Sequence, residues 1–157
     1  AFVILESWSA DIIEALGGYD GISPNFNELT TSGLLFTDFY GAGWTSDQAM
    51  SAMFSSAVVY PNFSIINDPE VFRSLPAITD QLHEVGYNSS YFFGGDLDYG
   101  NIKAYLLSKG FQNVKDEDVY DSEFTRGSLG VQDEFMFNQY IMKLMNLKSL
   151  FLRTYLQ

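Results

Sequence analysis

The sequence predicts an α/β fold in which a mostly parallel sheet is flanked by helices. Short apolar, β-prone runs alternate with helix signals along the whole chain, and Gly and Pro residues mark most of the boundaries. No internal repeat and no linker-like stretch divides the 157 residues, which match one domain on the usual scale of about 100–200 residues. Strands that alternate with helices in this way are typical of parallel sheets built from βαβ units.

In the first half of the chain, the boundaries follow from capping residues. Residues 2–5 are consecutive apolar residues and predict a buried strand. Ser or Thr before a helix and Gly after it are the usual start and stop signals. The helices predicted from these signals extend from Ser7 or Ser9 to Leu16, from Ser23-Pro24 to Gly33, and from Thr45, Ser46 or Asp47 to about Ala57. The apolar residues 34–40 predict a second strand.

The second half repeats the alternation. Leu75-Pro76 opens a predicted helix that Gly86 ends, and a predicted strand follows over 89–93. A helix over 101–108, closed by Gly110, comes next and is followed by an acidic loop over 115–123. The last two predicted elements are a helix over 133–145 and a terminal strand over 151–157.

Composition excludes several classes of protein. Hydrophobic residues make up 46% and aromatic residues 17%, which excludes disordered and low-complexity chains. Acidic residues outnumber basic ones 20 to 8, and the net charge of −12 repels phosphate backbones, so we expect no nucleic-acid partner. Because the chain has no Cys, disulfides and thiol chemistry are excluded. The sequence contains neither a signal peptide nor an apolar run of about 18 residues.

Side chains that could take part in catalysis or ligand binding follow three of the predicted strands. Glu6 is either an ordinary strand-end acid or a ligand for a hard cation. Residues 45–47 are either a helix cap or a hydroxyl nucleophile at a helix N-terminus, where backbone amides also receive an anion. The segment 94–96 is either a simple turn or a place where backbone and the Asp96 carboxylate approach a ligand. Since ligands gather at the carboxyl ends of parallel strands, all three could serve one site.

These residues occur in motifs that resemble a known family. The motifs are VILESWS at 3–9, SPNFNEL at 23–29, GLLFTDFY at 33–40, GWTSD at 43–47, GD at 95–96 and GVQDE at 130–134. Together they resemble the sulfatase-like members of the alkaline phosphatase superfamily, especially lipoteichoic acid synthases and related phosphoglycerol transferases. The resemblance covers essentially the whole chain and implies a truncated alkaline phosphatase/sulfatase-like fold.

The resemblance also implies a site. In that family the strand-end Glu and the Thr oxygen bind one divalent cation, so Glu6 and Thr45 are the expected metal ligands. Thr45 is the expected nucleophile, with Ser46 as the second choice. Asp96 and Lys103 are the expected substrate-binding residues, although Lys is a point charge where some relatives have the bidentate Arg. The implied cation is Mn²⁺ or Mg²⁺, with Zn²⁺ and Ca²⁺ as alternatives.

Departures from the family pattern indicate which part of the family's catalytic domain this sequence covers. The family completes its metal site with a downstream Asp-His pair, which this sequence lacks, and the single histidine, His83, is predicted to lie on a helix surface. Both ends look cut. Residues 1–157 are therefore predicted to be the N-terminal part of a single sulfatase-like catalytic domain, inactive by itself, with the C-terminal part absent.

The intact parent is accordingly expected to be a metal-dependent phosphoglycerol transferase-like enzyme that acts through a covalent Thr intermediate. Its expected place is the extracytoplasmic side of a bacterial membrane, anchored there, with an anionic and lipid-linked or glycan ester as substrate. Hydrolysis of a small sulfate or phosphate ester is the close alternative. An inactive fragment or binding module and a flavodoxin-like receiver are further alternatives. If the last strand has an unpaired edge, the fragment is expected to self-associate.

Overall fold

A computed structural model describes residues 1–120, 123–145 and 151–156, and the side chains of 1–120 and 123–145. The chain forms two compact units. The larger unit consists of Ala1–Ile4 with Ala42–Gln157, and the smaller unit consists of Leu5–Gly41.

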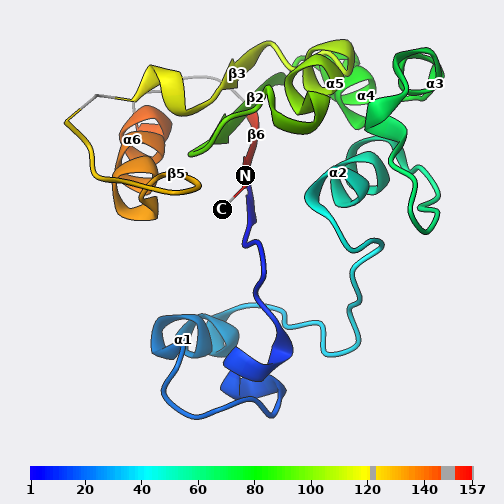
Figure 1. Ribbon diagram of the computed structural model, residues 1–157. Helices are drawn as coiled ribbons and strands as arrows, with labels where there is room; N and C mark the ends of the chain where they lie inside the picture. Colours follow the sequence, from blue (N-terminus) through cyan, green and yellow to red (C-terminus); the bar gives the residue numbers. More distant parts are fainter. Residues whose placement is uncertain (121–122, 146–150, 157) are drawn as a thin grey trace. The chain divides into compact units, whose positions relative to one another are not determined.

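A four-stranded parallel sheet organises the larger unit, which confirms the predicted α/β fold class (Figure 1). The order of its strands is β1-β6-β2-β3. Their bounds are Phe2–Ile4 for β1, Asn88–Phe93 for β2, Asn113–Lys115 for β3 and Phe151–Leu156 for β6. Thr154 of β6 is in register with Phe2 on one side and with Tyr91 on the other.

The position of β6 corrects one expectation. The terminal strand lies between β1 and β2, so both of its edges are paired, and the outer strands of the sheet are β1 and β3. The prediction that β1 is buried is also wrong, since Phe2 and Val3 are 49% and 48% exposed. An outer strand lacks a neighbour on one side and is therefore more exposed. A run of four apolar residues does not show whether its strand lies at the edge or in the middle of the sheet.

Helices connect the strands, as the alternation predicts. The bounds in the larger unit are α2 Ser46–Ser55, α3 Pro69–Ser74, α4 Ile78–Glu84, α5 Ile102–Ser108 and α6 Asp133–Met145. Three 3₁₀ turns, η3 Ile65–Asn67, η4 Tyr99–Asn101 and η5 Glu117–Val119, and a hairpin of β4 Arg126–Gly127 with β5 Gly130–Val131 complete it. Of the helices, α3 was not predicted, although Asp68 caps it by accepting from the amides of Glu70 and Val71.

Two hydrophobic clusters pack on the sheet through neighbouring residues of β2. Successive side chains of a strand point to opposite faces. Tyr91 belongs to a cluster formed largely by α2, α3, η3 and α5, and Phe92 belongs to a second cluster with residues of α6 and the hairpin. Both rings are buried, at 0% and 4% exposure. β2, which Gly94 and Gly95 follow, therefore packs against a hydrophobic cluster on each of its two faces.

The smaller unit contains two 3₁₀ turns, η1 Ala10–Ile12 and η2 Glu14–Leu16, followed by α1 Pro24–Ser32. The predicted helix after Ser9 is thus two separate turns, while α1 is confirmed with Pro24 in its first turn. The Ser23 hydroxyl donates to the Ile12 carbonyl at 2.5 Å, which ties the start of α1 to η1.

The strand predicted over 34–40 is wrong. The segment forms no strand, and its large apolar residues apart from the half-buried Leu35 are exposed, from 65% for Phe36 to 83% for Tyr40. β-prone residues form a strand only where a neighbouring strand supplies hydrogen-bond partners, and no strand among the described residues pairs with this segment. Within the described residues, no helix combines the length and the apolar character needed to cross a bilayer.

Candidate active site

Thr45 is the N-cap of α2, which selects it from the three caps that the sequence allowed, Thr45, Ser46 and Asp47. Its backbone is extended, with φ −127° and ψ 157°, and its carbonyl accepts the first helical hydrogen bond from the Ala49 amide at 3.0 Å. Its side chain is exposed and makes no capping hydrogen bond to the helix. Ser46, the second choice for the nucleophile, is the first residue inside the helix and is half-buried.

The Thr45 hydroxyl instead contacts the carboxylate of Asp47. Burial raises the pKa of Asp47, but contacts with the Ser64 and Thr45 hydroxyls and with backbone amides of the first helical turn outweigh burial and lower it. Asp47 is therefore ionised at neutral pH, and the Thr45 hydroxyl lies beside a negative charge.

Gln48 is a residue of this region that the sequence analysis missed. Its side chain is buried, its Oε1 accepts from the Trp44 amide at 2.9 Å, and its Nε2 donates to the carbonyls of Tyr60 and Phe63 at 3.2 and 3.1 Å. A signal was present in the sequence, because Thr45-x-x-Gln48 has the spacing of a capping box. Gln48 thereby ties the loop before Thr45 to the loop after α2.

Glu6 follows β1 by two residues and lies in an exposed turn. It belongs to the smaller unit, whereas Thr45 belongs to the larger unit. The structure gives no common geometry for these two side chains, so their pairing in one site stays a prediction.

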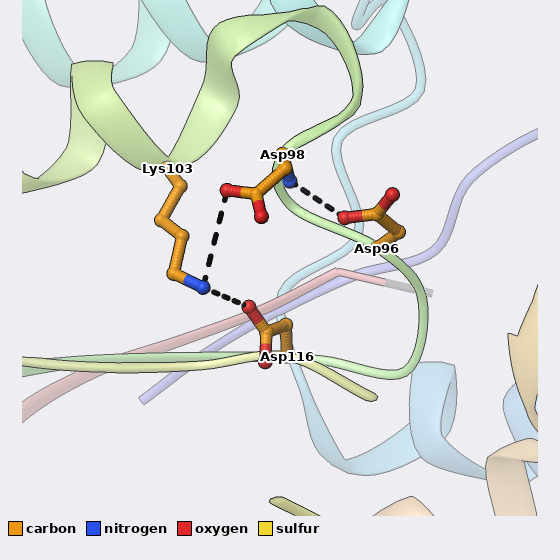
Figure 2. A network of polar contacts seen from close by, with 4 residues as sticks. All are labelled: Asp96, Asp98, Lys103 and Asp116. Atoms are coloured by element: carbon orange, nitrogen blue, oxygen red, sulfur yellow. Dashed lines mark hydrogen bonds and ion pairs between the residues drawn. The ribbon is translucent and has the colours of Figure 1, made fainter. Parts of the chain in front are cut away.

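Asp96 follows the buried Gly94 and Gly95 at the carboxyl end of β2, as predicted. The carboxylate of Asp96 is exposed and accepts from the Asp98 amide at 2.8 Å, which closes a local turn (Figure 2). The tight turn therefore presents a carboxylate at the edge of the sheet where ligands of α/β folds bind.

Lys103 lies at the start of α5 and makes two ion pairs in the same network. Its Nζ is 2.6 Å from Asp116 Oδ2 and 3.9 Å from Asp98 Oδ1 (Figure 2). The hydrogen bond to Asp116 raises the pKa of Lys103 above its ordinary value. The Asp116 side chain is only 8% exposed, so Lys103 is the cation that compensates a buried carboxylate.

The hairpin of β4 and β5 packs against the turn that carries Asp96. The Val131 amide donates to the Gly94 carbonyl at 2.7 Å. A Cβ on Gly130 would collide with the Gly94 carbonyl oxygen and lie 2.6 Å from the Gly95 Cα, and a Cβ on Gly95 would lie 2.5 Å from the Leu129 carbonyl oxygen. Glycine at these positions is therefore required by backbone-to-backbone contact.

The described residues do not assemble a metal centre by themselves. Glu6 and Thr45 offer the oxygen donors that a hard divalent cation prefers. However, no group of three or more His, Asp or Glu side chains in the described ranges could hold a metal ion. His83 is half-buried rather than on the surface, and its Nε2 lies 3.0 Å from the Ser89 hydroxyl, so it belongs to the packing of α4 on β2.

We expect Lys103→Met to lower the melting temperature of the protein, because Asp116 would be left without its cation. Since the pKa of Lys103 is raised, the pair stabilises the fold fully below pH 10.5 and loses this effect as the pH rises further through the folded-state pKa. Thermal unfolding across this range checks the prediction, with Lys103→Arg as the control that keeps the charge. A KM effect of Lys103→Met at unchanged melting temperature would show a substrate-binding role instead.

Solved structures of two proteins are similar to this one. A protein in the alkaline phosphatase superfamily from Vibrio parahaemolyticus matches with a TM-score of 0.88 and 26% sequence identity, over 99% of this chain and 39% of that chain. The lipoteichoic acid synthase LtaP from Listeria monocytogenes matches with a TM-score of 0.81 and 16% identity, over 99% of this chain and 40% of that chain. The fold is thus that of the alkaline phosphatase superfamily, and the chain spans about two-fifths of each relative.

The family model described as Sulfatase matches residues 1–152. The chain belongs to the sulfatase family, which confirms the resemblance seen in the motifs. Members of this superfamily are enzymes that act on phosphate or sulfate esters.

Proposed function

We propose that this chain is the N-terminal part of a single sulfatase-like catalytic domain whose intact form transfers a phosphoglycerol-type group through a covalent intermediate on Thr45. The observation that supports this proposal most is the state of the Thr45 side chain. It is exposed at the start of α2 and makes no capping bond. The N-terminus of a helix favours an anion, but the ionised Asp47 carboxylate already contacts the first-turn amides here, so the divalent cation proposed below would have to offset its charge when an ester phosphate approaches Thr45.

The proposed reaction has two balanced steps. The Thr45 Oγ gives up its proton and attacks phosphorus, an oxygen–phosphorus bond forms, and the bond to the leaving alcohol breaks while that alcohol takes up one proton, so that no net proton is gained or lost. An acceptor hydroxyl then attacks the same phosphorus, and Thr45 leaves and regains its proton. If water is the acceptor, the same residues carry out hydrolysis, and a sulfate ester would follow the same sequence at sulfur.

We further propose that the intact enzyme uses one divalent cation, Mn²⁺ or Mg²⁺, with Zn²⁺ and Ca²⁺ as alternatives, and that Glu6 and Thr45 are the ligands from this chain. Bound there, such an ion supplies Lewis-acid stabilisation of negative charge. Asp96 is proposed to contact substrate from the β2 turn. Lys103 shares that assignment, although its ion pair with Asp116 favours a structural role that the Lys103→Met experiment decides.

The setting of the intact protein is also a proposal. We propose a membrane-anchored parent on the extracytoplasmic side of a bacterial membrane, with a lipid-linked or glycan ester as substrate and no nucleic-acid partner, consistent with the net charge of −12. The 157-residue chain alone is proposed to be inactive and to self-associate through the outer edges of β1 and β3.

The test is to trap the intermediate. The full-length protein is incubated with phosphatidylglycerol and Mn²⁺ without an acceptor, digested and mapped by mass spectrometry, with the 157-residue chain as the inactive control. A phosphoglycerol adduct on Thr45 supports the proposal. An adduct on Ser46 moves the nucleophile by one residue, and turnover without any adduct contradicts covalent catalysis. Turnover of a nitrophenyl sulfate but not of a phosphate diester would identify a sulfatase.

A further inference from the structure

The start of α2 departs from an ordinary capping box in two respects. In a capping box, the hydroxyl of the first residue accepts from the helix, and the Glu or Gln three residues later accepts from the amide of that first residue. Here the Thr45 hydroxyl makes no capping bond, and the carboxamide of Gln48 accepts instead from the amide of Trp44, one residue earlier.

Gln48 also connects this amide to a second loop. Both hydrogens of its Nε2 are used, because this atom donates to the Tyr60 and the Phe63 carbonyls. Gln48 itself is only 7% exposed, so its end of each of these three hydrogen bonds is shielded from water.

Gly43 shows how closely the loop before Thr45 packs on Gln48. A Cβ on Gly43 would lie 2.6 Å from the Gln48 Cβ and 3.2 Å from the Val59 Cγ1. The loop can approach this closely only because residue 43 has no side chain. Gly43 and Gln48 together therefore hold the backbone that leads into Thr45.

We propose that Gln48 is a positioning residue for the Thr45 hydroxyl: its carboxamide fixes the loop, as a helix cap otherwise would, so that the hydroxyl takes no part in capping α2 and can attack the ester. This inference rests on the proposed function, since it takes Thr45 as the nucleophile. The rate of a nucleophilic attack depends steeply on the position of the nucleophile, and a misplacement of about 1 Å can lower that rate on the order of 10²-fold.

The experiment compares variants of the full-length protein. Gln48→Met keeps the shape of the side chain but removes all three hydrogen bonds. Gln48→Glu keeps the acceptor for the Trp44 amide but lacks the paired donors to Tyr60 and Phe63. Ser55→Ala is the control, because it removes a buried hydrogen bond at the other end of α2, where the Ser55 hydroxyl lies 2.8 Å from the Tyr105 hydroxyl.

We expect Gln48→Met to lower kcat by about 10–100-fold with KM changed by less than about threefold, and to slow adduct formation on Thr45 by the same factor. Hydrogen exchange at the Trp44 amide should accelerate in parallel. Gln48→Glu should recover part of kcat, because its carboxylate still accepts from that amide. Ser55→Ala should lower the melting temperature without changing kcat. Should Gln48→Met fail to fold, Gln48→Glu carries the same comparison.

Two outcomes separate this inference from the proposed function. Wild-type kcat in Gln48→Met, alongside an inactive Thr45→Ala, would overturn the positioning role and leave the proposed function standing. Full activity in Thr45→Ala would overturn the proposed function, and the positioning role with it.

Discussion

Thr45→Ala in the full-length protein is expected to lower kcat/KM by about 10³–10⁶-fold, because the substitution removes the attacking oxygen and, with it, one proposed metal ligand. The fold should persist. Thr45 is exposed, its hydroxyl does not cap α2, and its backbone carbonyl, which accepts from the Ala49 amide, is unchanged by the substitution.

Steady-state kinetics together with thermal unfolding check this prediction. Ser46→Ala is the matched control, since it removes the neighbouring hydroxyl from the first residue of the same helix. We expect Ser46→Ala to change kcat/KM by only a few-fold and stability by about 0.5 kcal/mol. Reversed effects of the two substitutions would assign the nucleophile to Ser46.

Gly130→Ala is expected to destabilise the protein by about 3 kcal/mol or more. Gly130 has φ +130°, which L side chains rarely adopt, and an added Cβ would collide with backbone atoms of Gly94 and Gly95. Backbone cannot yield as a flexible side chain can, so the hairpin must leave the end of β2 and lose the bond between the Val131 amide and the Gly94 carbonyl.

Urea denaturation measures this effect. Gly127→Ala is the control in the same hairpin, because an added Cβ there would meet its nearest atom, the Gly130 carbonyl oxygen, only at 4.0 Å. A change of less than about 0.5 kcal/mol is expected for the control. Equal stabilities of the two variants would show that the hairpin does not dock on this turn in solution.

Local signals in the sequence were sufficient for the elements around the candidate site. Thr45, one of the three predicted caps, precedes α2, Gly94 follows β2, and α6 spans 133–145 as predicted. Capping residues, glycine and apolar periodicity act over a few residues, so the determinants of these helix and strand boundaries are contained in the local sequence. The motifs at 3–9, 23–29 and 33–40 likewise indicated the sulfatase family, which the family match confirms.

The tertiary structure alone decided features whose causes lie far apart in the chain. The apolar residues 34–40 form no strand because none of the strands in the described part of the chain pairs with them, and β6 lies inside the sheet because β1 and β2 both pair with it. Lys103 pairs with Asp116, thirteen residues away, and Gln48 reaches the loop that contains Tyr60 and Phe63. Strand order, ion pairs and hydrogen bonds from side chains to loops depend on which segments of the chain are in contact in the folded structure. Sequence patterns with periods of two to four residues carry no information about these tertiary contacts.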